Sequence, residues 1–167
     1  MYDSIEEEIQ NLLVTGKYSP LFYKQFVDLV KSGKLEFDFI AREIEYLEGT
    51  RLETTTKKES MFRGEILKGL WHKHIFDAHN IATNVRNSLS RNWDNISKNT
   101  KDDKEFLKKI LKLIPKSVAN PKKTGDWIVY EKTDSGNYYL TFAAHSEADE
   151  AIYQRIEQYL TNNNDCV

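Results

Sequence analysis

The sequence contains little of three residues that shape a chain: one cysteine, three prolines and seven glycines among 167 residues. A single cysteine excludes a disulfide framework and a cysteine metal cage. The scarcity of glycine and proline favours long helices. No apolar run approaches the roughly 20 residues that span a bilayer, and acidic residues 6–8 stand where a signal peptide has a basic segment. We therefore expect a cytoplasmic protein of bacterial or phage type with no membrane partner.

The composition is typical of a globular protein. Hydrophobic residues make up 40% of the chain and charged residues 30%, which argues against a disordered chain. A chain of this length is ordinary for one domain and can bury a core. We therefore expect residues 1–167 to form a single domain.

The net charge of −2 conceals three segments of different sign. Residues 1–56 carry 6 basic and 11 acidic side chains, and residues 124–167 carry 2 basic and 8 acidic ones. Between them, residues 57–123 carry 16 basic and 7 acidic side chains, for a net charge of +9. A basic block favours a polyanionic partner. Acidic and basic segments that pair with each other within the fold explain the pattern equally well.

The first 49 residues predict an acidic unit of three helices. Apolar residues recur at helical spacing over residues 4–14, 20–32 and 35–47. Ser19 followed by Pro20 is typical of a helix N-terminus. Short connections between these segments favour one N-terminal unit within residues 1–49.

The second unit, residues 61–160, follows a polar segment over residues 50–60 that we expect to be a mobile loop. The longest helical pattern of the chain covers residues 64–93. A second basic helix is expected to end at Pro115. The second unit thus begins with a long basic helix and a shorter basic one.

After these helices the apolar period changes to two residues, which predicts a β-hairpin. Its strands are expected over residues 127–130 and 138–142, with turn residues at 133–137. A final helix is expected over residues 147–160. The predicted fold class is α+β, predominantly helical, with about six helices and a C-terminal antiparallel β-hairpin or small sheet.

Three of the four histidines lie within residues 71–79, inside the predicted long helix. At about 100° per residue, a helix places His72 and His74 on opposite sides, where they cannot bind one metal ion together. The HExxH signature, with histidines at i and i+4, is absent too. We therefore expect no metal site and no cofactor.

His74 lies on the apolar stripe of the predicted helix, and two interpretations stay open. It is either a neutral imidazole hydrogen-bonded within the core or a proton-transfer group at the floor of a cleft. His145, directly after the second strand, is either a site residue or an exposed loop residue. Together the two imidazoles suit metal-independent phosphodiester cleavage, in which one takes the 2′-hydroxyl proton and the other protonates the leaving oxygen.

Basic and aromatic side chains complete the candidate site. Lys73, Lys68 or Arg63 would stabilise the phosphorane charge, and Thr141 offers a hydroxyl on the second strand. Tyr130 and Tyr139 offer rings for base stacking. The candidate catalytic residues are therefore His74, His145, Lys73 and Thr141. The candidate nucleic-acid-binding residues are Arg63, Lys68, His72, His79, Arg86, Tyr130 and Tyr139. The alternative is that the charged residues and histidines form a solvated face and the tyrosines form part of the core.

Two segments together suggest a family. Residues 68–74 (KGLWHKH) and residues 125–130 (GDWIVY) resemble small phage-associated nucleases of the barnase, EndoU, colicin and RelE-like group, which includes toxins. The resemblance covers residues 63–156. It implies a catalytic helix packed against a small antiparallel sheet, and RNA cleavage without a metal ion.

Two function classes follow from the sequence. The first is a nucleic-acid-binding protein, with RNA favoured over DNA as the partner and RNA cleavage as the activity. The second is a non-enzymatic inhibitor or immunity-type protein, in which the acidic ends bind a protein partner and the histidines are structural. A lone hairpin leaves strand edges open, so a homodimer is also expected.

Overall fold

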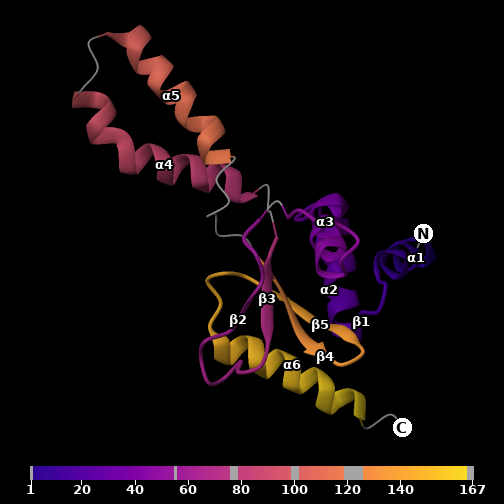
Figure 1. The fold of residues 1–167 in the computed structure, drawn as a ribbon. Coiled ribbons are helices and arrows are strands. Elements are labelled where there is room, and N and C mark those ends of the chain that lie inside the picture. Colours follow the sequence, from indigo (N-terminus) through magenta and orange to yellow (C-terminus); the bar gives the residue numbers. More distant parts are fainter. Residues whose placement is uncertain (1, 55, 76–78, 99–101, 119–125, 165–167) are drawn as a thin grey trace.

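The computed structural model describes residues 2–54, 56–75, 79–98, 102–118 and 126–164. Five strands form one mixed sheet in the order β1-β5-β4-β3-β2, in which β1 runs parallel to β5 and every other pair is antiparallel (Figure 1). The strands are β1 (Lys17–Tyr18), β2 (Ser60–Met61), β3 (Trp71–His74), β4 (Trp127–Thr133) and β5 (Gly136–Ala143). The α+β class is confirmed, but the strands are not confined to the C-terminal hairpin.

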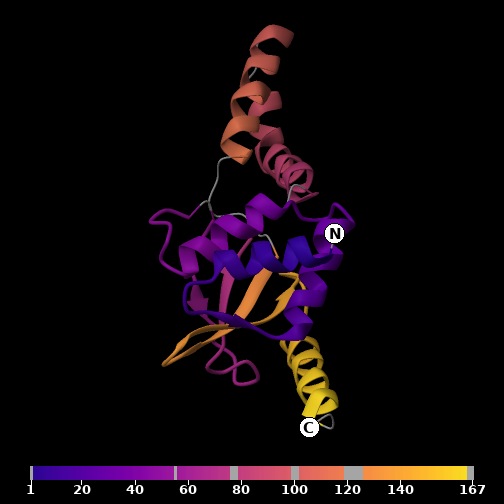
Figure 2. The ribbon, with the colours of Figure 1, turned by 90° about the vertical axis from the view of Figure 1, so that its right-hand side faces the viewer.

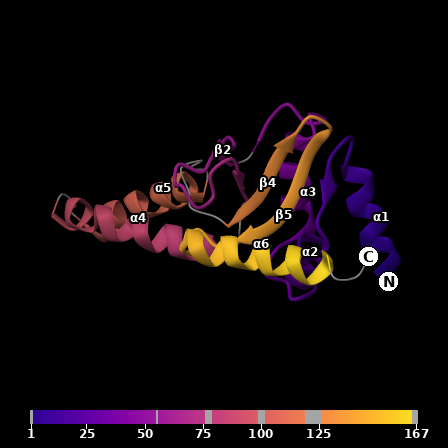
Figure 3. The same cartoon turned by 90° about the horizontal axis from the view of Figure 1, so that it is seen from below.

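Six helices are present in the described part of the chain. They are α1 (Tyr2–Leu12), α2 (Pro20–Lys31), α3 (Phe37–Leu47), α4 (His79–Lys98), α5 (Asp103–Val118) and α6 (Asp149–Asn164). Helices α1 to α3 lie over one face of the sheet (Figure 2), and α6 packs on the other face. Helices α4 and α5 form an antiparallel pair that projects beyond the sheet, on the side away from α1 (Figures 1 and 3). Within the described residues, no helix has the length and apolar content to cross a bilayer.

The local start and turn signals are confirmed. The Ser19 hydroxyl accepts the backbone N–H of Phe22 at 3.0 Å and donates to the carbonyl of Leu140 at 2.7 Å, so it begins α2 and ties it to β5. The hairpin turn leaves two residues between β4 and β5. Gly136 follows with a φ of 133°, which favours glycine.

The long helix expected over residues 64–93 is wrong. Residues 71–74 form β3, which pairs with β4 from Trp71 opposite Tyr130 to His74 opposite Trp127, and α4 begins only at His79. Because β3 forms backbone hydrogen bonds with both β2 and β4, the strand is favoured over the helix that the local spacing of apolar residues indicates. Helix α5 also continues to Val118, past Pro115 where we expected it to end.

The reason for expecting a homodimer does not hold. The hairpin is not a lone pair of strands, because β5 pairs with β1 and β4 pairs with β3. The two edge strands, β1 and β2, are two residues long. Such short edges offer little backbone for pairing with another chain.

Apolar side chains cover both faces of the sheet. On the α1–α3 face, the fully buried core includes Ile9, Phe22, Phe26, Ile40, Ile44, Ile128, Tyr130 and Tyr139. On the α6 face, the buried core consists of Phe62, Leu67, Val129, Leu140, Ala143, Ile152 and Ile156. This packing supplies the support that a two-stranded hairpin lacks in water.

The carboxylate of Glu48, just after α3, ties the N-terminal unit to the sheet. Its Oε2 accepts the N–H groups of Val14, Thr15 and Gly16 at 2.9, 3.0 and 2.9 Å, and its Oε1 accepts the hydroxyl of Tyr139 at 2.6 Å. Burial raises the pKa of Glu48, but the hydrogen bonds from Tyr139 and the backbone outweigh it and lower the pKa below the ordinary 4.5. A Cβ at Gly16 would lie 2.3 Å from Glu48 Oε1, so a side chain there would displace the carboxylate from these hydrogen bonds.

We expect Glu48→Gln to lower the free energy of unfolding by about 1–3 kcal/mol at neutral pH, because charge-assisted hydrogen bonds are lost. A lowered pKa means that Glu48 contributes stability above pH 4.5 and loses it as the pH falls through the folded-state pKa. Urea denaturation at pH 7 and at about pH 3.5 should therefore show a smaller difference in acid. Glu45→Gln, which removes a surface ion pair with Arg51, is the control and should change little. An equal loss at both pH values would contradict the assignment.

Candidate functional site

Strand β3 separates its side chains between the two faces of the sheet. In a strand, alternate residues share a face, so His72 and His74 point together toward α6, and Lys73 points toward α3. The ring centroids of His72 and His74 are 5.6 Å apart. The expectation that these two histidines lie on opposite sides was wrong, because it assumed a helix.

The strand register brings the indole of Trp127 and a third imidazole, that of His145, to the same place. His74 lies opposite Trp127, which lies opposite Ala143 at the end of β5. His145 follows two residues later. Its ring centroid lies 5.7 Å from that of His74 and 4.8 Å from that of Trp127. The structure thus brings His74 and His145 together, although they are 71 residues apart in the sequence.

We call the rings of His72, His74, His145, Trp127 and Phe62 the imidazole site. Trp127 lies at its centre, with ring-centroid distances of 4.7 Å to His72, 6.0 Å to His74 and 5.5 Å to Phe62. Phe62 stands 4.6 Å from His72 and closes the inner side. His145 is exposed and His74 is 5% exposed, so the site runs from the core to the surface.

The indole of Trp127 determines which nitrogen of His74 carries the proton. Trp127 Nε1–H donates to His74 Nδ1 at 3.2 Å, and an acceptor Nδ1 requires the neutral ring with its hydrogen on Nε2. No described residue takes that Nε2–H. The backbone of His74 is held as well, since the Thr56 hydroxyl donates to its carbonyl at 2.6 Å.

Burial keeps two of the three imidazoles neutral. It lowers the pKa of His74 from 6.5 to about 4, and the positive charge of Lys57 is the next cause. Burial likewise lowers the pKa of His72 to about 4, followed by the effects of His145 and Lys57. At neutral pH both rings are therefore uncharged and act as hydrogen-bonding groups.

His72 has one nitrogen at the surface of the fold and one inside. Its Nε2 lies 3.2 Å from the hydroxyl of Ser60 on the edge strand β2. Its Nδ1 is buried and has no hydrogen-bond partner among the residues that the structure describes. A buried nitrogen without a partner is costly, and such groups collect at functional sites.

Two of the proposed catalytic residues lie away from the imidazoles. Lys73 is fully buried on the opposite face of the sheet, 2.6 Å from Glu43 Oε2. Thr141 is fully buried too, and its hydroxyl donates to Gln25 Oε1 at 2.7 Å and accepts Arg155 Nε–H at 3.2 Å. Val129 on β4 lies between Thr141 and His72. Neither side chain reaches the imidazole site directly.

The proposed nucleic-acid-binding residues are dispersed. Tyr130 and Tyr139 are fully buried in the core on the α1–α3 face, so their rings are sealed from bases. Burial also raises the pKa of both phenols. Arg63 and Lys68 are exposed in the β2–β3 connection, where Lys68 pairs with Glu65 at 3.1 Å.

His79 and Arg86 belong to α4, but their side chains lie outside the described part of the chain.

The sequence alone did not indicate Trp127, Lys57, Phe62 or Ser60 as site residues. Trp127 was placed correctly at the start of a strand, but only the register of β3 shows that it faces the histidines. Lys57 lies in the polar segment expected to be a mobile loop, and the structure instead holds its carbonyl by a hydrogen bond to Lys73 at 2.8 Å. No local signal in the sequence marks either residue.

The three imidazoles do not form a metal-binding group. Among the described residues, no set of three or more His, Cys, Asp or Glu side chains is arranged to hold a metal ion. The indole of Trp127 stands in contact with all three imidazoles.

Comparison with protein-family models, curated proteins and solved structures gives no match.

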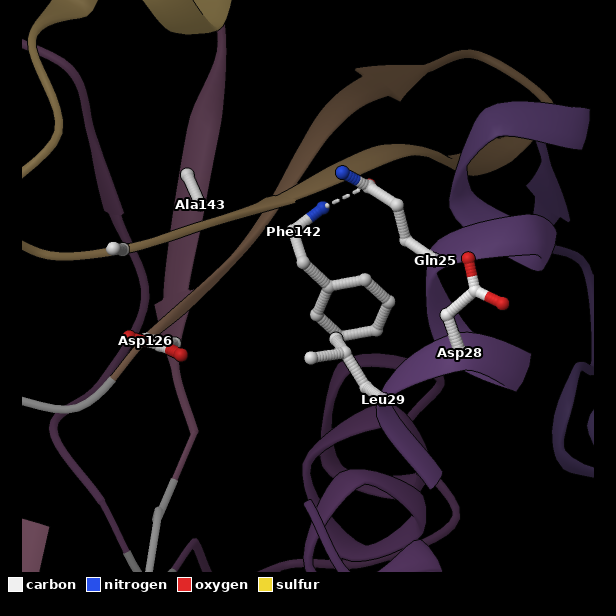
Figure 4. A pocket seen from close by; sticks show the side chains of 7 residues that line it. Gln25, Asp28, Leu29, Asp126, Phe142 and Ala143 are labelled. Atoms are coloured by element: carbon white, nitrogen blue, oxygen red, sulfur yellow. Dashed lines mark hydrogen bonds between the residues drawn. The ribbon is translucent and has the colours of Figure 1, made fainter. Parts of the chain in front are cut away.

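A small pocket opens at the same end of the sheet, on the α2 side (Figure 4). It has a volume of about 230 Å³ and is lined by Gln25, Asp28, Leu29, Asp126, Phe142, Ala143 and Ala144. The Phe142 N–H donates to Gln25 Oε1 at 2.9 Å, so the glutamine side chain takes the place of a neighbouring strand. One of its lining residues, Ala144, directly precedes His145 in the sequence.

We expect NMR titration of the imidazole signals to give pKa values near 4 for His72 and His74. Trp127→Phe should raise the pKa of His74, because the indole N–H stabilises only the neutral ring. Trp71→Phe, on the opposite face of the sheet, is the control and should leave that pKa unchanged. A His74 pKa that does not respond to Trp127→Phe would contradict the tautomer assigned here.

Proposed function

We propose that this protein binds RNA and cleaves it at the imidazole site. The observation that carries the proposal is the meeting of an exposed imidazole, His145, with a buried neutral one, His74, at the end of the sheet where the basic α4–α5 pair is attached. One ring is free to exchange protons with solvent, and the other is held as a hydrogen-bond donor. Cleavage of a phosphodiester by acid–base catalysis needs both a group that transfers protons and a donor that stabilises the phosphoryl oxygens.

The α4–α5 pair supplies positive charge next to the site. Residues 79–118 carry nine basic and four acidic side chains. Exposed cations on the two helices include Arg91, Lys98, Lys104, Lys108 and Lys112. The pair follows β3 and precedes β4 in the chain, so its base lies near the end of β3 and the start of β4 (Figure 1). Cations placed there attract a phosphate backbone toward the site.

The chemistry we propose uses the substrate's own nucleophile. His145 takes the proton of a ribose 2′-hydroxyl, and the 2′-oxygen forms a bond to phosphorus. The bond from phosphorus to the 5′-oxygen breaks, water protonates that oxygen, and the exposed His145 releases its proton to solvent, which leaves a cyclic 2′,3′-phosphate and a 5′-hydroxyl. The Nε2–H of His74 and the charge of Lys57 stabilise the phosphoryl oxygens as negative charge develops.

RNA is favoured over DNA because deoxyribose has no 2′-hydroxyl. The resemblance to phage-associated nucleases supports the same substrate. It implied a catalytic helix, whereas the histidine-bearing segment is a strand here, so the proposal depends on the geometry of the site. The alternative of an inhibitor-type protein depends on exposed Glu6, Glu7 and Glu8 of α1, which would bind a basic protein partner.

We expect His145→Ala to reduce RNA cleavage by about 10²–10⁴-fold, the usual contribution of a general acid–base group. The melting temperature should stay unchanged, because His145 is exposed. Cleavage of a labelled RNA oligonucleotide, with detection of the cyclic phosphate, is the measurement. Ser146→Ala, the exposed neighbour, is the matched control. Full activity of the His145→Ala protein would remove this residue from the mechanism.

We expect RNA binding by the inactive His145→Ala protein to weaken with salt. Replacing Lys104, Lys108 and Lys112 by glutamine should lower the slope of log affinity against log salt by about two, since each single-strand phosphate contact contributes about 0.7. The control replaces Lys17, Lys24 and Lys34, which are exposed outside the basic block. Affinity that is independent of salt would contradict the proposal. Binding of a basic protein in place of RNA would favour the inhibitor alternative.

A further inference from the structure

Lys73 is a fully buried cation whose side chain ends on the face of β3 opposite to the histidines. Its Nζ lies 2.6 Å from Glu43 Oε2, 2.7 Å from Thr54 Oγ1, 2.5 Å from Thr56 Oγ1 and 2.8 Å from the carbonyl of Lys57. An ammonium has three protons to donate, and four acceptors surround this one. The ammonium is therefore held by a built polar network within a core that is mostly apolar.

We propose that Lys73 is a positioning residue, which anchors the segment Thr54, Thr56 and Lys57 against the backbone of His74 and thereby sets the place of the Lys57 charge. We call these three residues the anchor segment. The inference rests on the proposed function, since it names what aligns the cation of that site.

The hydrogen bonds of the anchor segment lead from Lys73 to the backbone of His74. Lys73 Nζ donates to Thr56 Oγ1, and the Thr56 hydroxyl in turn donates to the His74 carbonyl at 2.6 Å. Thr54 closes a second branch, because its hydroxyl donates to Glu43 Oε2 at 2.6 Å. Hydrogen bonds linked in this way strengthen one another in a low-dielectric interior.

Lys57 is the member of the anchor segment that acts on the imidazoles. Its carbonyl is bound by Lys73, and its half-buried side chain lowers the pKa of both His72 and His74. The other charged or titratable groups that act on His74 are His72, His145 and Lys73 itself. Burial is the largest cause of the lowered pKa of His74, and Lys57 is the largest of the electrostatic causes.

Replacing a buried polar network often leaves stability intact if the shape is kept, so stability alone does not test a positioning role. The informative variant is the double change Thr54→Val and Thr56→Val. It removes two acceptors of Lys73 and the donor to His74, and it leaves every charge in place. Lys57→Met removes the cation itself. The change that it causes in the pKa of His74 is therefore the largest change that displacement of Lys57 can cause.

We expect the pKa of His74, measured by NMR titration, to rise by on the order of one unit in the threonine double variant and in Lys57→Met. In the Lys57→Met background, the threonine changes should raise it no further, which is the signature of a shared cause in a double-mutant cycle. Ile40→Val, in the core on α3, is the control for a general loss of packing and should leave the pKa unchanged.

An unchanged pKa of His74 in the threonine variant would overturn the inference, and so would an equal rise with and without Lys57. Lys73→Met leaves Glu43 buried without its cation, so it serves as a second variant only if it folds. The titration needs no RNA. If the wild-type protein fails to cleave RNA, the proposed function fails, while the titration still decides whether Lys73 positions Lys57.

Discussion

The buried ion pair between Lys73 and Glu43 is the constraint on which the rest of the site depends. Removing an ammonium from water costs several kcal/mol, which only a close carboxylate and further oxygen acceptors offset. Glu43 on α3 and the oxygens of the anchor segment provide them on one face of the sheet only. Lys73 must therefore point toward α3. Strand alternation then places His72 and His74 on the α6 face.

Trp127 gives the three imidazoles different chemistry. Its N–H fixes the neutral tautomer of His74, and its ring contacts the exposed His145 as well as the two buried imidazoles. Histidines in contact with one another would compete for a proton, because each charged ring disfavours the next. Burial resolves the competition by keeping His72 and His74 neutral. The same indole thus contacts all three imidazoles, of which two are buried and one is exposed.

Local signals predicted the elements that local chemistry specifies. Ser19 with Pro20 begins α2, and the turn after Thr133 joins β4 to β5, as expected from their sequences. Strand β3 was missed for a physical reason. It has four residues, of which three are polar, and its partner β4 lies more than 50 residues away in the sequence. Residues 64–93 do not include that partner strand, so the helical spacing of their apolar residues led to the prediction of a helix.

The sequence by itself determined the inventory of the candidate site: two histidines separated by one lysine, a histidine just after a strand, and a basic segment between the strands. It also determined the hairpin and five of the six helices in outline. Only the tertiary structure decided which side chains meet. The pairing of β3 with β4 turned His72 and His74 to one face, brought Trp127 and His145 against them, and placed Lys73 on the other face. Contacts of this kind depend on strand register, which long-range pairing sets and local spacing does not.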